Sequence, residues 1–152
     1  MEYIRTATAQ DEGEGCFFCD KLFAGDDEKS YILVRTAPAF IILNAFPYNP
    51  GHLMVAPTRH VGDFEELIPG ELTALGELLQ RATRALRESY NPDGFNLGMN
   101  LGRVAGAGVP GHLHWHVVPR WNGDTNFMPV IADTKVLPEA LAQTYARLKP
   151  HF

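Results

Sequence analysis

The apolar positions of this chain follow two different periods. Short apolar runs bounded by Gly, Pro or Asn predict five β-strands, at residues 31–36, 39–44, 50–57, 95–102 and 111–120. Leu and Ala at three- and four-residue spacing predict a long helix that opens at Pro69 and stops near residues 90–94, and a second amphipathic helix at about 137–148. This order of elements favours an α+β fold built on a mainly antiparallel sheet.

The length and composition indicate one domain. The 152 residues suit a single hydrophobic core, and no internal repeat or long linker divides them. Hydrophobic residues make up 45% and charged residues 20%, as in ordinary soluble globular proteins. Residues 1–15 are polar and acidic, so we expect a flexible arm at the start of a single domain over residues 1–152.

The sequence also limits location and partners. No apolar run approaches the roughly 20 residues of a membrane-spanning helix, so we expect no membrane partner. The N-terminus lacks the basic start and apolar core of a secretory signal, which favours a cytoplasmic location. The net charge of −5, without any Lys/Arg cluster, argues against binding to long nucleic acid.

Three of the six histidines occupy alternate positions of one segment, "GHLHWHVVPR" at residues 111–120. Alternate side chains of a strand share a face, so His112, His114 and His116 would line one side of the sheet. Such a face fits a solvent-exposed strand rich in histidine, a three-histidine metal site, or nucleophilic and acid–base chemistry by imidazole. The spacing alone leaves the two chemical interpretations open.

Two further motifs carry candidate chemistry. The only cysteines, Cys16 and Cys19, form "CFFC", which fits a metal site, a redox pair or two buried thiols; the βαβ setting of a thioredoxin-type redox motif is absent. The stretch "GRVAGAGVPG" at residues 102–111 matches G-x-G-x-x-G, but a strand rather than a helix is expected after it. We therefore interpret it as a phosphate-cradling turn, with a plain strand connection as the alternative.

The histidine segment resembles the signature of the histidine triad (HIT) superfamily of nucleotide hydrolases and transferases, His-φ-His-φ-His-φ-φ with φ apolar. Residues 44–67, "NAFPYNPGHLMVAPTRHVGDFEEL", resemble the strand–loop–strand segment of this family that carries another histidine. Residues 119–129, "PRWNGDTNFMP", resemble the segment after the triad in the dinucleoside-polyphosphate-cleaving branch. The resemblance covers roughly residues 16–138 in consistent order and implies a HIT-like fold.

The resemblance implies a covalent mechanism. His114 would attack an α-phosphorus and form a nucleotidyl-histidine, which water or phosphate then resolves. His116 would hydrogen-bond the phosphate oxygens or the leaving group, and His52 would orient it. Imidazolium and backbone N–H groups would stabilise the developing charge, so no catalytic cofactor is expected.

The resemblance also implies a nucleotide-binding set: Asn44, Asn100, Gly106, Ala107, Gly108 and Trp121. Asn44 has a plainer interpretation as an Asx turn, and Trp121 as an ordinary rim aromatic. The chain departs from the branch at Ala107-Gly108, because relatives place a Gly-Ser pair there, and this removes one side-chain contact to the leaving group.

Structural zinc is implied in the same way. Several family members bind zinc through a CxxC pair, the histidine of a P-x-x-H segment and the first triad histidine, which correspond here to Cys16, Cys19, His60 and His112. His112 would then be a ligand and take no part in the reaction. The remaining His151 has no partner that the sequence suggests, and we expect it in solvent.

Family members extend their sheet across a two-fold axis, which implies a homodimer, and the alternating apolar positions of residues 95–102 would suit an edge that needs cover. Three other functions stay open. A purine nucleoside phosphoramidase is the alternative within the family, although it usually carries an acidic residue at the position of Asn44. A three-histidine metallohydrolase and a catalytically idle nucleotide sensor are the alternatives outside this mechanism.

Overall fold

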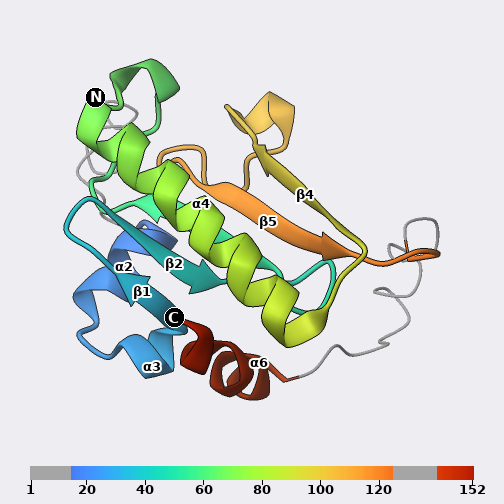
Figure 1. Cartoon of the computed structure of the whole chain (residues 1–152). Helices are drawn as coiled ribbons and strands as arrows, with labels where there is room; N and C mark the ends of the chain where they lie inside the picture. The colour runs from blue at the N-terminus through green and yellow to red at the C-terminus, as the bar shows by residue number, and fades with distance from the viewer. Residues whose placement is uncertain (1–14, 125–139) are drawn as a thin grey trace.

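The structure is a computed structural model that describes residues 15–124 and 140–152. Five antiparallel strands form one open sheet in the order β1-β2-β3-β5-β4 (Figure 1). They are β1 Ile32–Arg35, β2 Ala39–Leu43, β3 Leu53–Pro57, β4 Gly94–Met99 and β5 Trp115–Arg120. The predicted α+β fold with a five-stranded antiparallel sheet is therefore confirmed.

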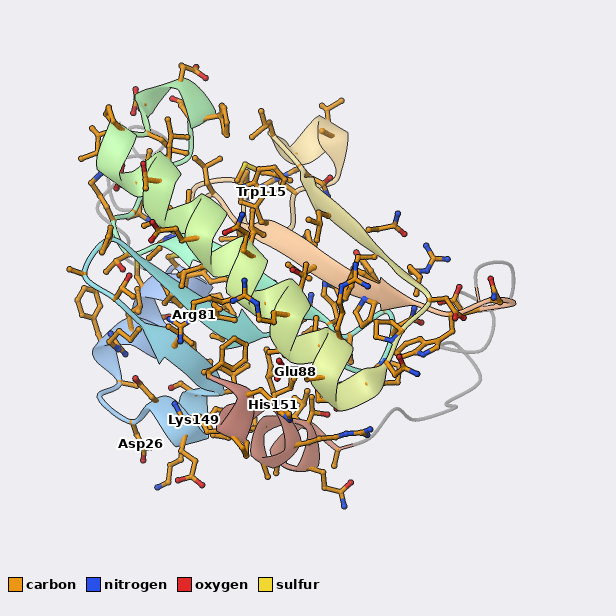
Figure 2. All side chains as sticks on the ribbon, in the orientation of Figure 1. Asp26, Arg81, Glu88, Trp115, Lys149 and His151 are labelled. Atoms are coloured by element: carbon orange, nitrogen blue, oxygen red, sulfur yellow. The ribbon has the colours of Figure 1, made fainter. Side chains whose placement is uncertain are left out.

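The two faces of the sheet pack against different layers because alternate residues point to opposite sides. One face carries Val55 and Val117, which pack under the long helix α4 (Pro69–Tyr90). The other carries Met54 and Ala56, which pack with the short helix α2 (Phe17–Phe23). Trp115 lies on the α4 side of β5 (Figure 2). The histidine face is thus the one opposite α4.

Local sequence explains where α4 begins and ends. Pro69 occupies its first turn, and the Glu71 carboxylate accepts a hydrogen bond of 3.1 Å from the Ile68 N–H. Apolar residues at three- and four-residue spacing face the sheet, and the helix stops at Asn91, whose φ of 48° is left-handed. The predicted long helix is confirmed.

All five strands are shorter in the structure than in the prediction, and those predicted at residues 50–57 and 111–120 begin three and four residues later. Pro50, Gly51 and His52 lie in a turn before β3, where Gly51 has a φ of +84° and an added Cβ would approach Leu86 Cδ2 at 2.9 Å. The fifth strand begins only at Trp115, because the preceding chain pairs elsewhere: the Leu113 N–H donates to the Val61 carbonyl at 2.8 Å. Only one histidine of the triad therefore lies inside a strand.

The terminal elements complete the fold. The helix α2 and the one-turn helix α3 (Asp27–Ser30) were not predicted from the sequence. The helix α6 (Leu141–Leu148) agrees with the predicted final helix, and the part of that prediction at residues 137–139 lies outside the described residues. His151 has a partner, contrary to expectation: its Nδ1 lies 3.0 Å from Glu88 Oε2 (Figure 2). Among the described residues, no helix is long and apolar enough to cross a membrane.

Candidate active site and metal centre

Three histidines from two parts of the chain meet on the sheet face opposite α4. His52 precedes β3, His114 immediately precedes β5, and His116 pairs within β5 with Met54 of β3. The ring centroids of His114 and His116 are 5.0 Å apart, and those of His52 and His116 are 5.1 Å apart. The rings of His52, His114 and His116 therefore lie close together although β5 begins only at Trp115.

The hydrogen bonds of His52 assign its tautomer and that of His116. The Tyr48 N–H donates to His52 Nδ1 at 3.2 Å, so a neutral His52 carries its proton on Nε2. That Nε2–H donates to His116 Nδ1 at 2.9 Å. His116 consequently carries its own proton on Nε2, where it can donate to a bound oxyanion or a leaving group.

A backbone carbonyl assigns the tautomer of His114. The carbonyl oxygen of His112 lies 2.9 Å from His114 Nδ1, and a carbonyl can only accept, so Nδ1 carries the proton. The lone pair of His114 is therefore on Nε2. An unprotonated imidazole nitrogen held in this way is the form that acts as a nucleophile.

Burial keeps these rings neutral. It lowers the pKa of His52 to about 3, with further contributions from the nearby His116 and His114. Burial also lowers the pKa of His114 and of His116 below the ordinary value for histidine. The Phe18 ring, whose centroid is 4.8 Å from that of His114, supplies part of the apolar cover.

Four other side chains form a compact cluster on the same face of the sheet: Cys16, Cys19, His60 and His112, whose candidate ligand atoms all lie within 4.8 Å of one another. His112 Nδ1 is 3.2 Å from His60 Nδ1, 3.4 Å from Cys16 Sγ and 3.6 Å from Cys19 Sγ. The Zn–S and Zn–N distances of a tetrahedral ion, about 2.3 and 2.0–2.1 Å, place its ligand atoms roughly 3.3 to 3.8 Å apart. The predicted four residues thus come together at spacings that fit a tetrahedral metal ion.

The surroundings of the cluster fix its donor atoms. His112 Nε2–H donates to the Pro57 carbonyl at 2.7 Å, which leaves Nδ1 as the lone-pair nitrogen facing the thiols. Burial, together with Cys16, raises the pKa of the Cys19 thiol to about 12, so thiolate formation there depends on the charge of a bound cation. An added Cβ on Gly62 would lie 3.0 Å from the Pro110 carbonyl oxygen, so glycine allows the His60 segment to approach the His112 segment.

This geometry separates the three triad histidines. The side chain of His112 belongs to the cysteine cluster, whereas Nδ1 of His114 and Nδ1 of His116 are occupied by a carbonyl and by His52. The three rings therefore do not converge on one ion. Within the described residues, 15–124 and 140–152, the cluster of Cys16, Cys19, His60 and His112 is the group of side chains whose arrangement could hold a metal ion.

A known protein family matches most of this chain. The sequence profile of the HIT domain matches residues 26–123, which is more than half of the chain. The chain belongs to the HIT family. The matched region contains His52, His60 and the triad, and it ends before Asp124.

Relatives of this HIT protein include nucleotide enzymes. It is 45% identical over 118 residues to an AP-4-A phosphorylase of Mycobacterium tuberculosis, a match that covers 78% of this chain and 60% of the relative. It is 35% identical over 92 residues to a bis(5'-adenosyl)-triphosphatase of Dictyostelium discoideum, covering 60% of this chain and 61% of the relative. The chain thus spans about three fifths of the length of these relatives.

A solved structure shares the fold. A Zn-bound histidine triad family protein from Mycobacterium smegmatis superposes with a TM-score of 0.72 at 27% identity, covering 90% of this chain and 91% of that protein. The described part of this chain therefore has the same architecture as that protein.

The predicted nucleotide-binding residues lie at different places along the sheet of this HIT domain. Asn44 forms the Asx turn that was the plainer alternative, since its Oδ1 accepts from the Phe46 N–H at 2.7 Å, and its Nδ2 lies 3.3 Å from His52 Nε2. Asn100 and Trp121 lie at opposite ends of the β4–β5 pair, because Asn100 follows Met99 and Trp121 follows Arg120. The predicted set therefore extends along the sheet and does not form one cluster.

The glycine-rich stretch of the HIT domain is a turn that leads toward β5, not into an α-helix, in line with the rejection of a dinucleotide fingerprint. The N–H groups of Ala105, Gly106 and Ala107 donate to the carbonyls of Gly102 and Arg103 within that turn. Ala107 is buried, and the Asn100 side chain donates to the Gly106 carbonyl at 3.4 Å. Nucleotide binding by Gly106, Ala107 and Gly108 stays a prediction.

Several residues of the site were not found from the sequence. Phe18 of α2 is fully buried and covers His114. The centroid of the Tyr48 ring lies 4.8 Å from that of the His52 ring. Asn49 is also buried, at 3% exposure, directly before the His52 turn. The available signal was the density of aromatic and turn residues in "FPYNPGH", which points to an ordered loop but not to its contacts.

The depressed pKa of His52 predicts an acid-dependent loss of stability. The unfolded chain protonates His52 near its ordinary pKa of 6.5, whereas the folded protein keeps it neutral down to about pH 3. The stabilisation is therefore complete above about pH 6.5 and decreases as the pH falls toward 3, by about 1.4 kcal/mol per pH unit for one such histidine. Urea unfolding at several pH values measures it.

The matched control is His52→Gln, which removes the titrating group and retains a polar side chain. All other ionisable groups are common to the two proteins, so the difference between the two slopes isolates His52. Equal slopes for the two proteins between pH 4 and 6.5 would show that His52 is not held neutral by the fold.

Proposed function

We propose that this HIT protein cleaves dinucleoside polyphosphates, such as diadenosine tetraphosphate, at an α-phosphorus through a nucleotidyl-His114 intermediate. The observation that carries the proposal is the His112 carbonyl on His114 Nδ1, which leaves Nε2 as an unprotonated nucleophile next to a proton donor, His116. The named activities of the AP-4-A phosphorylase and the bis(5'-adenosyl)-triphosphatase support the substrate class.

The first step transfers the nucleotidyl group. The lone pair of His114 Nε2 forms a bond to the α-phosphorus while the bond from phosphorus to the bridging oxygen breaks. The departing nucleotide leaves with that electron pair, and the Nε2–H of His116 donates to the oxygen. His52 holds His116 in this tautomer through its 2.9 Å hydrogen bond.

The second step releases the nucleotide. An oxygen of phosphate or water attacks the same phosphorus, the bond to His114 Nε2 breaks, and the electron pair returns to the ring; when water attacks, the proton that it loses passes to solvent. Phosphate yields ADP from an adenylyl group and water yields AMP. Asn44, Asn100, Gly106, Ala107, Gly108 and Trp121 are the proposed nucleotide contacts.

We also propose that the cysteine cluster holds structural zinc. Two thiols and two imidazole nitrogens are a donor set that zinc takes in closed tetrahedral sites. The Zn-bound relative from Mycobacterium smegmatis supports this choice of ion. Bound zinc would supply fixed coordination of His112, while the transfer itself needs no cofactor.

One assay separates the possible reactions. Purified protein is incubated with diadenosine tetraphosphate, with and without inorganic phosphate, and the products are separated by chromatography. ADP plus ATP, formed only with phosphate, identifies a phosphorylase; AMP plus ATP identifies a hydrolase. If neither pair of products forms, the proposal is wrong, and an adenosine phosphoramidate substrate then tests the phosphoramidase alternative.

We further propose a homodimer formed along β4. This strand ends the sheet in the described part of the chain and pairs only with β5 there. Leu97 is 47% exposed, and Val104, in the turn after β4, is fully exposed. Sedimentation equilibrium at micromolar concentration should give twice the chain mass, and Val104→Glu should shift it toward the monomer. A wild-type monomer would contradict this assembly.

A further inference from the structure

We propose that Asn49 and Asp124 form a clasp that positions His52 for catalysis, a role that rests on the proposed function. The clasp consists of the Asn49 side-chain amide, the Asp124 carboxylate and the Pro119 carbonyl. Asn49 Nδ2 donates to Pro119 O at 2.8 Å and to Asp124 Oδ2 at 2.8 Å. It thereby joins the loop before β3 to the end of β5.

The loop side of the clasp leads directly to His52. The His52 N–H donates to the Asn49 carbonyl at 3.2 Å, and the adjacent Tyr48 N–H donates to His52 Nδ1 at 3.2 Å. The second of these bonds sets the tautomer that holds His116. A shift of Asn49 therefore moves both backbone groups that define the orientation of the His52 ring.

The carboxylate side is equally constrained. Asp124 Oδ2 also accepts from the Trp121 N–H at 3.0 Å, and Asp124 Oδ1 accepts from Arg120 at 2.9 Å. Arg120 also donates to the Asn96 side chain on β4. One carboxylate thus connects the His52 loop to the chain that carries Trp121.

The side-chain chemistry explains why asparagine stands at position 49. Asp, Ser and Gly would also suit a turn before Gly51, but the side chain faces two acceptors and is almost completely buried, at 3% exposure. An amide nitrogen supplies two donors, which a carboxylate or a hydroxyl cannot. Asparagine at position 49 is therefore explained by the two acceptors that its side chain faces, and not by the turn alone.

The test is a double-mutant cycle with Asn49→Ala, Asp124→Ala and the double variant, using diadenosine tetraphosphate as substrate. Each single variant should lower kcat between about 10- and 100-fold, because a misplaced catalytic group costs rate, while KM stays within a few-fold. The double variant should lose no more than either single one, since both break the same clasp. The control is Asn122→Ala, at an exposed residue in the turn that contains Asp124, and it should retain wild-type kcat.

A spectroscopic measurement makes the result independent of turnover. Long-range ¹H–¹⁵N spectra distinguish the two tautomers of each imidazole, and the clasp variants should lose the Nε2–H tautomer of His52 while Asn122→Ala keeps it. If Asn49→Ala does not fold, Asp124→Ala carries the same test. Unchanged His52 tautomer and kcat, or additive losses in the double variant, overturn the proposal. If the wild-type protein does not cleave the substrate, the proposed function fails, and the spectra still decide the clasp.

Discussion

His114→Ala should reduce kcat for diadenosine tetraphosphate on the order of 10⁴-fold or more, the largest effect expected of any single substitution here. The variant removes the only ring whose Nδ1 is held by the His112 carbonyl and whose Nε2 is thereby free to bond to phosphorus. The remaining His52 and His116 are paired with each other through Nε2 and Nδ1, so neither offers an equivalent nucleophile. Steady-state kinetics with chromatographic detection of products measures the loss.

Two comparisons show that the effect belongs to the nucleophile. His116→Ala should cost less, about 10²- to 10⁴-fold, because it removes proton donation and leaves the attacking nitrogen in place. His151→Ala, at a histidine paired with Glu88 at the end of α4, should change kcat by no more than about twofold. A His114→Ala protein within tenfold of wild-type activity would show that another group attacks the phosphorus.

The covalent intermediate gives this prediction a direct readout. After rapid mixing with substrate and alkaline quenching, which spares the acid-labile phosphorus–nitrogen bond, the wild-type protein should gain the mass of one nucleotidyl group. His114→Ala should gain none. A mass increase that persists in the variant would place the covalent bond on a different residue.

Sequence patterns predicted the elements whose signal is periodic. The spacing of four apolar residues was sufficient to predict α4, because each of these buried side chains faces the sheet: Leu75, Leu78, Ala82 and Leu86. The triad was found because alternate positions of an extended chain share a face whether or not the residues form a ladder. His114 thus shares a face with His116 although β5 begins only at Trp115.

The features that sequence could not predict depend on contacts between distant segments. The start of β5 is set by the Leu113–Val61 hydrogen bond, and the tautomers are set by Tyr48 and by the His112 carbonyl, none of which has a periodic signal. His151 was expected in solvent because its partner Glu88 is 63 residues away in the chain. The residues of the metal cluster came from family resemblance, since Cys16 and His112 are 96 positions apart.

Removal of the metal should have the second largest effect, on stability and on His114 together. Cys19→Ser should abolish stoichiometric zinc binding, measured by elemental analysis, and lower the free energy of unfolding on the order of 5 kcal/mol or more, because metal binding by a closed site contributes directly to folding. The cluster ties α2 to segments before and after α4, so its loss releases contacts that are far apart in sequence.

Cys19→Ser should also change the tautomer of the nucleophile, His114, although Cys19 is not in contact with the reacting nitrogen. His112 uses Nδ1 toward the cluster and its backbone carbonyl toward His114 Nδ1, so a ring freed from the metal no longer fixes the carbonyl that assigns the His114 tautomer. In long-range ¹H–¹⁵N spectra, His114 of Cys19→Ser should become a mixture of tautomers, and kcat should fall. The pair formed by His52 and His116 is held by Tyr48 and should keep its wild-type signals.

Chelation distinguishes this arrangement from a metal that takes part in the reaction. Chelator added during turnover should leave the initial rate of the wild-type protein unchanged, because His114 and His116 perform the transfer, and activity should decline only as zinc dissociates and the fold loosens. Prolonged chelation should reproduce the stability of Cys19→Ser and have no further effect on that variant. Immediate inhibition by chelator, or a wild-type protein that folds and binds no metal, would contradict the coupling of the cysteine cluster to His114.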